Sequence, residues 1–202
     1  FKNIDEFYQN FYQNLGQDLN KFFEEKSEII MQKKIKHPVY SIEDIKFRLV
    51  RDFFLNQSQY DEIMISMIKE KKFNFSNFYK KLFFQKDDLK NLDKLGHLVG
   101  IHSHNHPTLL EKLSYDEQKY QYDKCQSTIS NILNKPKNDI NFMSHPCGSY
   151  NEDTLKILKE LRIELGFKQI MTLEPEKGMR KINNSCLEIA RQNHSEVLKR
   201  MN

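Results

Sequence analysis

The stretch GHLVGIHSHNHPTL, residues 96–109, places three histidines directly after a short apolar run. Residues 98–101 are typical of a buried strand, and His102, His104 and His106 follow it within five positions. His102 and His106 are four residues apart, so one turn-like step would point both side chains into a single site. His104 would then point the other way.

Two neutral imidazoles in this arrangement are suitable ligands for zinc. A catalytic zinc ion normally takes three protein ligands and keeps one position open, so the pair requires a third group from elsewhere in the protein. Histidines in a loop can equally be surface residues or hydrogen-bonded structural ones, and the spacing alone leaves both alternatives open.

From about residue 87 onward, helical patterns alternate with short apolar runs, which indicates a parallel α/β arrangement. Helices are expected over residues 87–95 and after the capping residues Ser114 and Ser149, each followed by Glu three positions later. The expected strands are residues 98–102, 140–144 and 167–173.

The first half of the chain has the pattern of amphipathic helices. One is expected over residues 1–23 with a possible break at Gly16, and another follows the capping pair Ser41 and Asp44. Shorter helices are expected over residues 61–69 and 74–82. We interpret the aromatic residues of this half as core packing rather than as a ligand groove or a membrane-surface helix.

A chain of 202 residues can form one domain with a full core, or a core domain that carries an insertion. Its 32 basic and 28 acidic residues give a net charge of +4, which does not predict nucleic-acid binding. No apolar run is long enough to span a membrane. The three cysteines suggest no disulfide framework, which fits a reducing compartment, so the location is expected to be cytoplasmic or is left unknown; no oligomeric state is indicated.

Four segments, in order, resemble the polysaccharide deacetylase family (NodB-like, carbohydrate esterase family 4), over about residues 89–197. They are GIHSHNHPTLLEKLSYDE, NFMSHPCGSYNEDTLKIL, ELGFKQIMTLEPEKG and LEIARQNHSEV. The first resembles the His-Ser/Thr-X-X-His motif, and the second an Aromatic-X-X-Pro-X-Gly-X-Tyr-Asn run that precedes a helix.

The resemblance implies part of a distorted (β/α)7 barrel that removes acetyl groups from a carbohydrate. It also implies a divalent metal, usually zinc, bound by one Asp and two His. By position, His102 and His106 would be the two metal ligands, and Ser103 would orient their loop. His194 is expected to be a surface histidine rather than a general acid.

The resemblance also assigns substrate-binding residues to the second segment. Pro146, Cys147, Gly148 and Tyr150 would shape the acetyl pocket, and the backbone of this turn could help to hold an oxyanion. Arg191, in the last segment, would orient an Asp of the family's first motif.

That first motif, a strand ending in Thr-Phe-Asp-Asp-Gly, is not in this sequence. The Asp87-Asp88 pair opens a predicted helix, so we interpret it as helix capping. We therefore expect the catalytic Asp pair to lie upstream of Phe1. Residues 1–86 would be a helical insertion, and residues 87–202 the carboxyl-terminal part of the barrel.

Three hypotheses follow. The chain is part of a metal-dependent carbohydrate deacetylase, a hydrolase of carbon–nitrogen bonds other than peptide bonds, that lacks its base here. Alternatively, it is an inactive relative that binds a glycan or a protein, or an unrelated α/β protein. An upstream Asp pair distinguishes the first two, and zinc binding distinguishes the second from the third.

Overall fold

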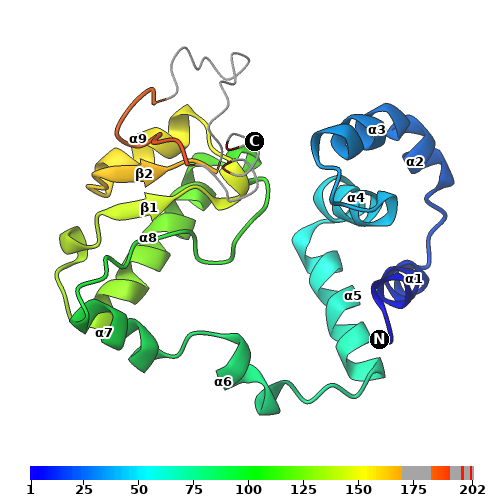
Figure 1. The fold of residues 1–202 in the computed structure, drawn as a ribbon, viewed down its shortest axis with the longest axis horizontal. Coiled ribbons are helices and arrows are strands. Elements are labelled where there is room, and N and C mark those ends of the chain that lie inside the picture. Colours follow the sequence, from blue (N-terminus) through cyan, green and yellow to red (C-terminus); the bar gives the residue numbers. More distant parts are fainter. Residues whose placement is uncertain (170–182, 192–196, 198–200, 202) are drawn as a thin grey trace. The chain divides into compact units, whose positions relative to one another are not determined.

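The computed structural model describes residues 1–169, 183–191, 197 and 201. Two compact units make up the chain, Phe1–Tyr79 and Lys80–Asn202 (Figure 1). Helices form the first unit, whereas the second combines helices with a small parallel sheet. No helix within the described ranges is long and apolar enough to cross a membrane.

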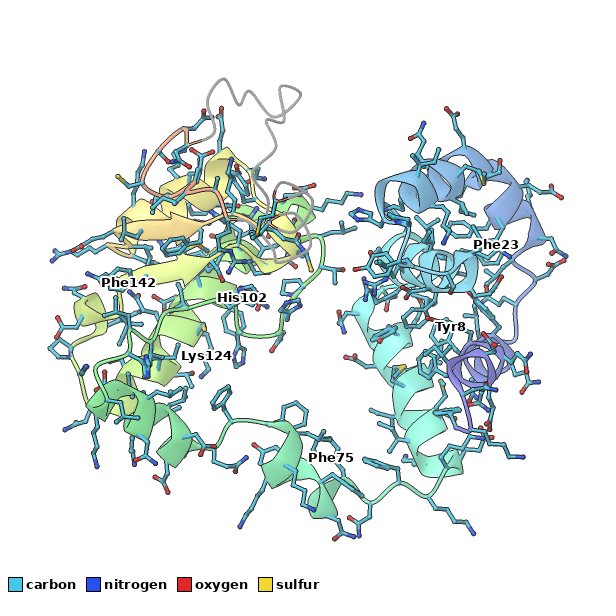
Figure 2. The ribbon with its side chains drawn as sticks, viewed as in Figure 1. Tyr8, Phe23, Phe75, His102, Lys124 and Phe142 are labelled. Carbon is cyan, nitrogen blue, oxygen red and sulfur yellow. The ribbon has the colours of Figure 1, made fainter. Side chains whose placement is uncertain are left out.

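The first unit is built from short helices around an aromatic core. Its elements are α1 (Ile4–Leu15), α2 (Asn20–Glu25), α3 (Ser27–Lys36), α4 (Ile42–Leu49), the π-helical turn η1 (Val50–Phe54), α5 (Gln57–Glu70) and the 3-10 turn η2 (Phe75–Asn77). Gly16 ends α1 at a φ of 65°, which confirms the predicted break. Phe11 and Phe47 pack edge to face in the core, near Tyr8, which Figure 2 labels.

The aromatic residues after α5 do not follow the core-packing prediction. The helix expected over residues 74–82 is instead the short turn η2 and the four-residue α6 (Tyr79–Leu82). The phenylalanines of residues 74–82, Phe75 and Phe78, are exposed rather than buried. Neither element is long enough to present a continuous apolar stripe to a core, so the pattern of apolar residues was misleading here.

The second unit contains α7 (Lys86–Lys94), η3 (Leu110–Lys112), α8 (Tyr115–Leu133), η4 (Lys137–Asp139), β1 (Phe142–Ser144), η5 (Pro146–Gly148), α9 (Glu152–Glu160) and β2 (Leu165–Phe167). Strands β1 and β2 pair in parallel, with Met143 opposite Gly166. Single bridges extend the sheet on both sides, from Ile101 to Met143 and from Phe167 to Ile189.

The sheet has one face against the core. Ile101 and Met143 are almost fully buried, in one cluster with Tyr122 of α8 and Ile157 and Leu158 of α9. The alternate strand residues Phe142, Ser144, Leu165 and Phe167 are only half-buried, as expected from the twofold periodicity of strands.

The structure confirms an α/β arrangement with parallel pairing, but the predicted barrel is not seen. The described residues form a two-stranded sheet with two bridges. Pairing at residues 98–102 is limited to Ile101, and the strand expected over residues 167–173 is observed as β2, three residues ending at Phe167. Residues 170–173 lie outside the described ranges.

Helix caps were predicted with mixed success. Ser114 forms the expected capping box with Glu117, and Ser41 accepts a hydrogen bond from the backbone of Asp44. Ser149, however, does not cap α9. Asn151 does, with Thr154 as its capping-box partner.

We expect Gly166→Ala to destabilise the protein strongly. A Cβ at residue 166 would lie 2.5 Å from the carbonyl oxygen of Leu187, so strand and neighbouring segment would have to separate. Overpacking against backbone costs about 3 kcal/mol of unfolding free energy. Urea denaturation of wild type and variant would measure the loss.

Gly96→Ala is the matched control for this substitution. A Cβ there meets no atom within 4 Å, although the φ of 83° is unfavourable for alanine. That strain alone costs about 1 kcal/mol. If Gly96→Ala were the more destabilising change, the close approach at Gly166 would not be a real constraint.

Candidate functional site

His102 lies at the sheet, one residue after the bridge formed by Ile101 (Figure 2). Its Nδ1 atom is 2.6 Å from the carbonyl oxygen of Ser144 at the end of β1. A carbonyl oxygen can only accept, so Nδ1 carries the proton. The Nε2 atom is therefore the nitrogen with a lone pair, and the ring is held in the tautomer that binds a metal through Nε2.

The neutral form of His102 is favoured electrostatically. Burial lowers the pKa of His102 from its usual 6.5, and the nearby His106 and Arg191 lower it further. The hydrogen bond with Ser144 acts in the opposite direction but is the smaller effect. These effects together favour the neutral ring, which is the form that a metal ligand needs.

The loop after His102 brings the second histidine beside it. The rings of His102 and His106 have their centroids 4.9 Å apart. The side-chain oxygen of Ser103 accepts a hydrogen bond from the His106 backbone at 3.1 Å, and His106 has a φ of 54°. His104 instead packs its ring against Tyr120 of α8. The predicted orientation of the three histidines is thus observed.

Helix α8 also holds this loop through a residue that the sequence analysis missed. The side-chain oxygen of Gln121 accepts a hydrogen bond from the backbone of Asn105 at 2.8 Å. Gln121 is buried, although glutamine is mostly a surface residue. No local sequence signal distinguishes it from an exposed glutamine.

A cavity of about 390 Å³ opens beside His102 on the half-buried face of the sheet. Its lining is apolar apart from a few polar groups, and comprises Leu98, Gly100, Ile101, His102, Phe142, Met143, Ser144, Leu165, Phe167 and Arg191. Arg191 is anchored there because its Nε donates to the carbonyl oxygen of Lys168 at 2.8 Å. The predicted residues His102 and Arg191 therefore share one cavity, of the kind that binds small molecules.

The turn predicted to bind substrate does not line this cavity. Pro146 and Tyr150 are buried, whereas Cys147 is exposed. The backbone N–H groups of Gly148 and Ser149 donate within the turn, to His145 and Pro146. Both N–H groups are therefore engaged within the turn, and the assignment of Pro146, Cys147, Gly148 and Tyr150 to substrate binding stays a prediction.

His145 is a further buried group at the end of β1. Its ring stacks on Tyr150 with centroids 4.3 Å apart, and Nε2 lies 2.8 Å from the carbonyl oxygen of Leu187. Tyr150 donates to Glu188 at 3.1 Å. The turn after β1 is thereby tied to the segment that leads to Arg191. No role for His145 was predicted from the sequence.

The donor set partly fits a metal. His102 and His106 are two adjacent imidazoles, one of them in a fixed tautomer, but no His, Cys, Asp or Glu joins them as a third ligand within the described ranges. Asp88 accepts from the backbone of Gln85 and caps α7, as predicted, and Asp87 pairs with Lys90. His194 lies outside the described residues.

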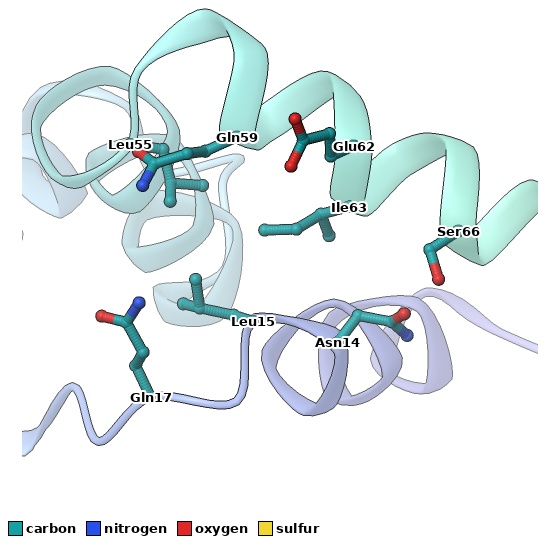
Figure 3. A pocket seen from close by; sticks show the side chains of 8 residues that line it. All are labelled: Asn14, Leu15, Gln17, Leu55, Gln59, Glu62, Ile63 and Ser66. Carbon is teal, nitrogen blue, oxygen red and sulfur yellow. The ribbon is translucent and has the colours of Figure 1, made fainter.

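A second cavity, of about 260 Å³, lies within the first unit between α1 and α5 (Figure 3). Amide and aliphatic side chains form most of its lining, and Glu62 is the one ionisable group among the lining residues. A single carboxylate cannot act as a paired acid and base, so the histidine site is the stronger candidate for chemistry.

Two comparisons with known proteins give a match. A family model described as polysaccharide deacetylase matches residues 50–166. Among solved structures, the chain is similar to a Streptococcus pyogenes deacetylase, PplD, in complex with acetate. The identity is 21% and the TM-score is 0.47, over 63% of this chain and 55% of that one. A comparison with curated proteins found no match.

We expect the stability of the protein to fall as the pH is lowered from 6.5 toward 4, because of His145. Burial lowers the pKa of His145 from 6.5 to about 4, so in this interval the unfolded chain binds a proton that the folded chain does not. Unfolding is then favoured by up to about 1.4 kcal/mol for each pH unit. Urea denaturation at several pH values measures this slope.

His145→Phe separates this effect from that of the other histidines. Phenylalanine retains a ring against Tyr150 but cannot titrate, so the variant should lose less stability on acidification than the wild type. Equal slopes for the two proteins would show that His145 is not the group responsible.

Proposed function

The chain belongs to the polysaccharide deacetylase family, and we propose that it hydrolyses acetyl groups of an acetylated carbohydrate. The single observation that carries this proposal is the contact between His102 Nδ1 and the Ser144 carbonyl. It holds His102 in the tautomer whose Nε2 carries the free lone pair, at the edge of a cavity of about 390 Å³, which supports a role as a metal ligand.

His102 and His106 would hold a divalent metal, which we propose to be zinc. A metal ion held there would supply Lewis acidity toward the acetyl carbonyl and the attacking water. The carbonyl of Ser144 would keep the ring of His102 in its orientation. Ser103 and Gln121 would fix the loop that carries His106.

The remaining catalytic groups are proposed to come from an Asp pair in sequence that precedes Phe1. One Asp would be the third metal ligand, and the other would accept the proton of the attacking water. Arg191, anchored on the Lys168 carbonyl, would orient one of these carboxylates. This arrangement requires that the strands described here form part of a larger (β/α)7 barrel.

In this proposal, residues 1–86 are a helical insertion in the barrel and residues 87–202 are its carboxyl-terminal part. The family match begins at residue 50, within the helical unit, so part of that unit is within the family pattern. The chain spans 55% of the solved deacetylase to which it is similar. Because the chain spans only this part, deacetylation by the whole protein is proposed here and not observed.

A second candidate is an inactive relative that binds a glycan or a protein partner. It is favoured by the lack of a third ligand near His102 and His106 in the parts of the chain that the structure describes. Two protein ligands hold zinc weakly, so this candidate predicts poor metal retention and no hydrolysis.

Substitution of the three histidines tests the proposal in the protein as its native source makes it. We expect His102→Ala and His106→Ala each to lose zinc and to lower deacetylation at least about 100-fold, because a ligand is removed. His104→Ala is the matched control from the same loop, and it should retain both metal and activity. Zinc content after dialysis and acetate release are the measurements.

Retention of zinc by both His102→Ala and His106→Ala would contradict the metal site. If the wild type itself retained zinc poorly and released no acetate from acetylated oligosaccharides, the inactive binding protein would be favoured instead.

A further inference from the structure

Residues 72–86, KFNFSNFYKKLFFQK, form a segment with an unusual combination of exposure, aromatic content and charge. It contains no acidic residue. Its large apolar side chains are all exposed, by the following fractions: Phe73 42%, Phe75 43%, Phe78 42%, Tyr79 46%, Leu82 61%, Phe83 49% and Phe84 71%. Phe75 is labelled in Figure 2 on the ribbon between α5 and α7. We call this the basic aromatic segment.

Its four lysines carry the net charge of the chain. They are Lys72, Lys80, Lys81 and Lys86. The whole chain has 32 basic and 28 acidic side chains, so the rest of it has 28 of each and no net charge. Every one of the four is exposed, and none forms an ion pair with another described residue.

We propose that the basic aromatic segment attaches the protein to the surface of a membrane that contains anionic lipids. Clustered lysines are attracted to anionic headgroups, and phenylalanine and leucine gain free energy by entering the boundary of the hydrocarbon layer. The segment offers both kinds of group within fifteen residues. This inference goes beyond the proposed deacetylation and does not depend on it.

The local structure suits attachment at the surface rather than insertion across the bilayer. Before α7 begins at Lys86, the segment has only the three residues of η2 and the four of α6 as regular elements. Most backbone groups of such a segment need water as a partner, which is present at headgroup depth but not in the hydrocarbon layer. The stacked pair Phe73 and Phe78, with centroids 5.1 Å apart, is a compact apolar group that can enter at that depth.

The composition of the basic aromatic segment disfavours two other partners, a carbohydrate and a second copy of the same segment. Phenylalanine and leucine have no polar atom with which to recognise sugar hydroxyls, and five of the seven apolar residues are phenylalanine. Association with a second copy of the same segment would bring four positive charges against four. An anionic bilayer satisfies both the charge and the apolar side chains.

Flotation with lipid vesicles tests the proposal on the protein as its native source makes it and on residues 1–202. We expect binding to phosphatidylcholine vesicles that contain phosphatidylglycerol, weakened by salt, and little binding to phosphatidylcholine alone. Equal binding to both vesicle types, or none to either, would overturn the proposal.

Two pairs of variants separate charge from apolar insertion. The double variant K80E/K81E should bind at least about 30-fold more weakly, because each lysine contributes to attraction by the anionic surface. Its control, K21E/K33E, makes the same change of net charge at exposed lysines of the first unit and should bind like the wild type.

The apolar pair is L82S/F84S, which should bind about tenfold more weakly because two exposed apolar side chains are lost. Its control, I35S/V39S, removes side chains that are exposed by 78% and 87% elsewhere in the chain. Circular dichroism of each variant checks folding. Equal effects of variants and controls would overturn the assignment to this segment.

Polygalacturonate, a soluble acidic polysaccharide, tests the main competing hypothesis, which is that the segment binds a glycan. If it bound the wild type with the same sensitivity to K80E/K81E and L82S/F84S while vesicles did not bind, the segment would be a glycan site and the membrane proposal would be wrong.

Discussion

The pairing of Ile101 with Met143 is the contact on which the candidate site depends. The backbone of Ile101 donates to Phe142 at 2.8 Å and accepts from Ser144 at 3.1 Å. This register places His102 against the end of β1, where the Ser144 carbonyl fixes its tautomer. Gly100 allows the backbone before Ile101 to lie this close to β1, since a Cβ at residue 100 would lie 2.6 Å from the Phe142 carbonyl oxygen. A backbone constraint thus determines which nitrogen of His102 is available.

The features predicted correctly are those with local causes. The capping box at Ser114, the break at Gly16 and the opposed directions of His104 and His106 each depend on residues within about one helical turn. The strand-to-loop position of His102 followed from the apolar run before it. These signals arise from short-range geometry, which the sequence contains directly.

The features that were missed depend on contacts distant in sequence. Gln121 and Gln126 are buried because each satisfies backbone groups, of Asn105 in one case and of Ile140 and Leu161 in the other. An unsatisfied buried carbonyl or N–H is costly, so these glutamines replace the water that would otherwise be required. Nothing in their neighbours in sequence predicts this. The third metal ligand presents the same difficulty, since a ligand set is assembled from separate strands.

The distribution of charge shows why average composition was a weak guide to partners. A net charge of +4 on 202 residues indicates an ordinary surface, and the lysines at 80 and 81 resemble those of any exposed helix. The structure shows that the phenylalanines next to these lysines are exposed. A cluster of charges beside a cluster of exposed apolar side chains indicates a different partner from either cluster alone. Burial decides between core packing and interaction surface for an aromatic segment, and burial is set by the whole fold. The same apolar residues that predict a core by their spacing therefore form a surface when their helices are too short to reach one.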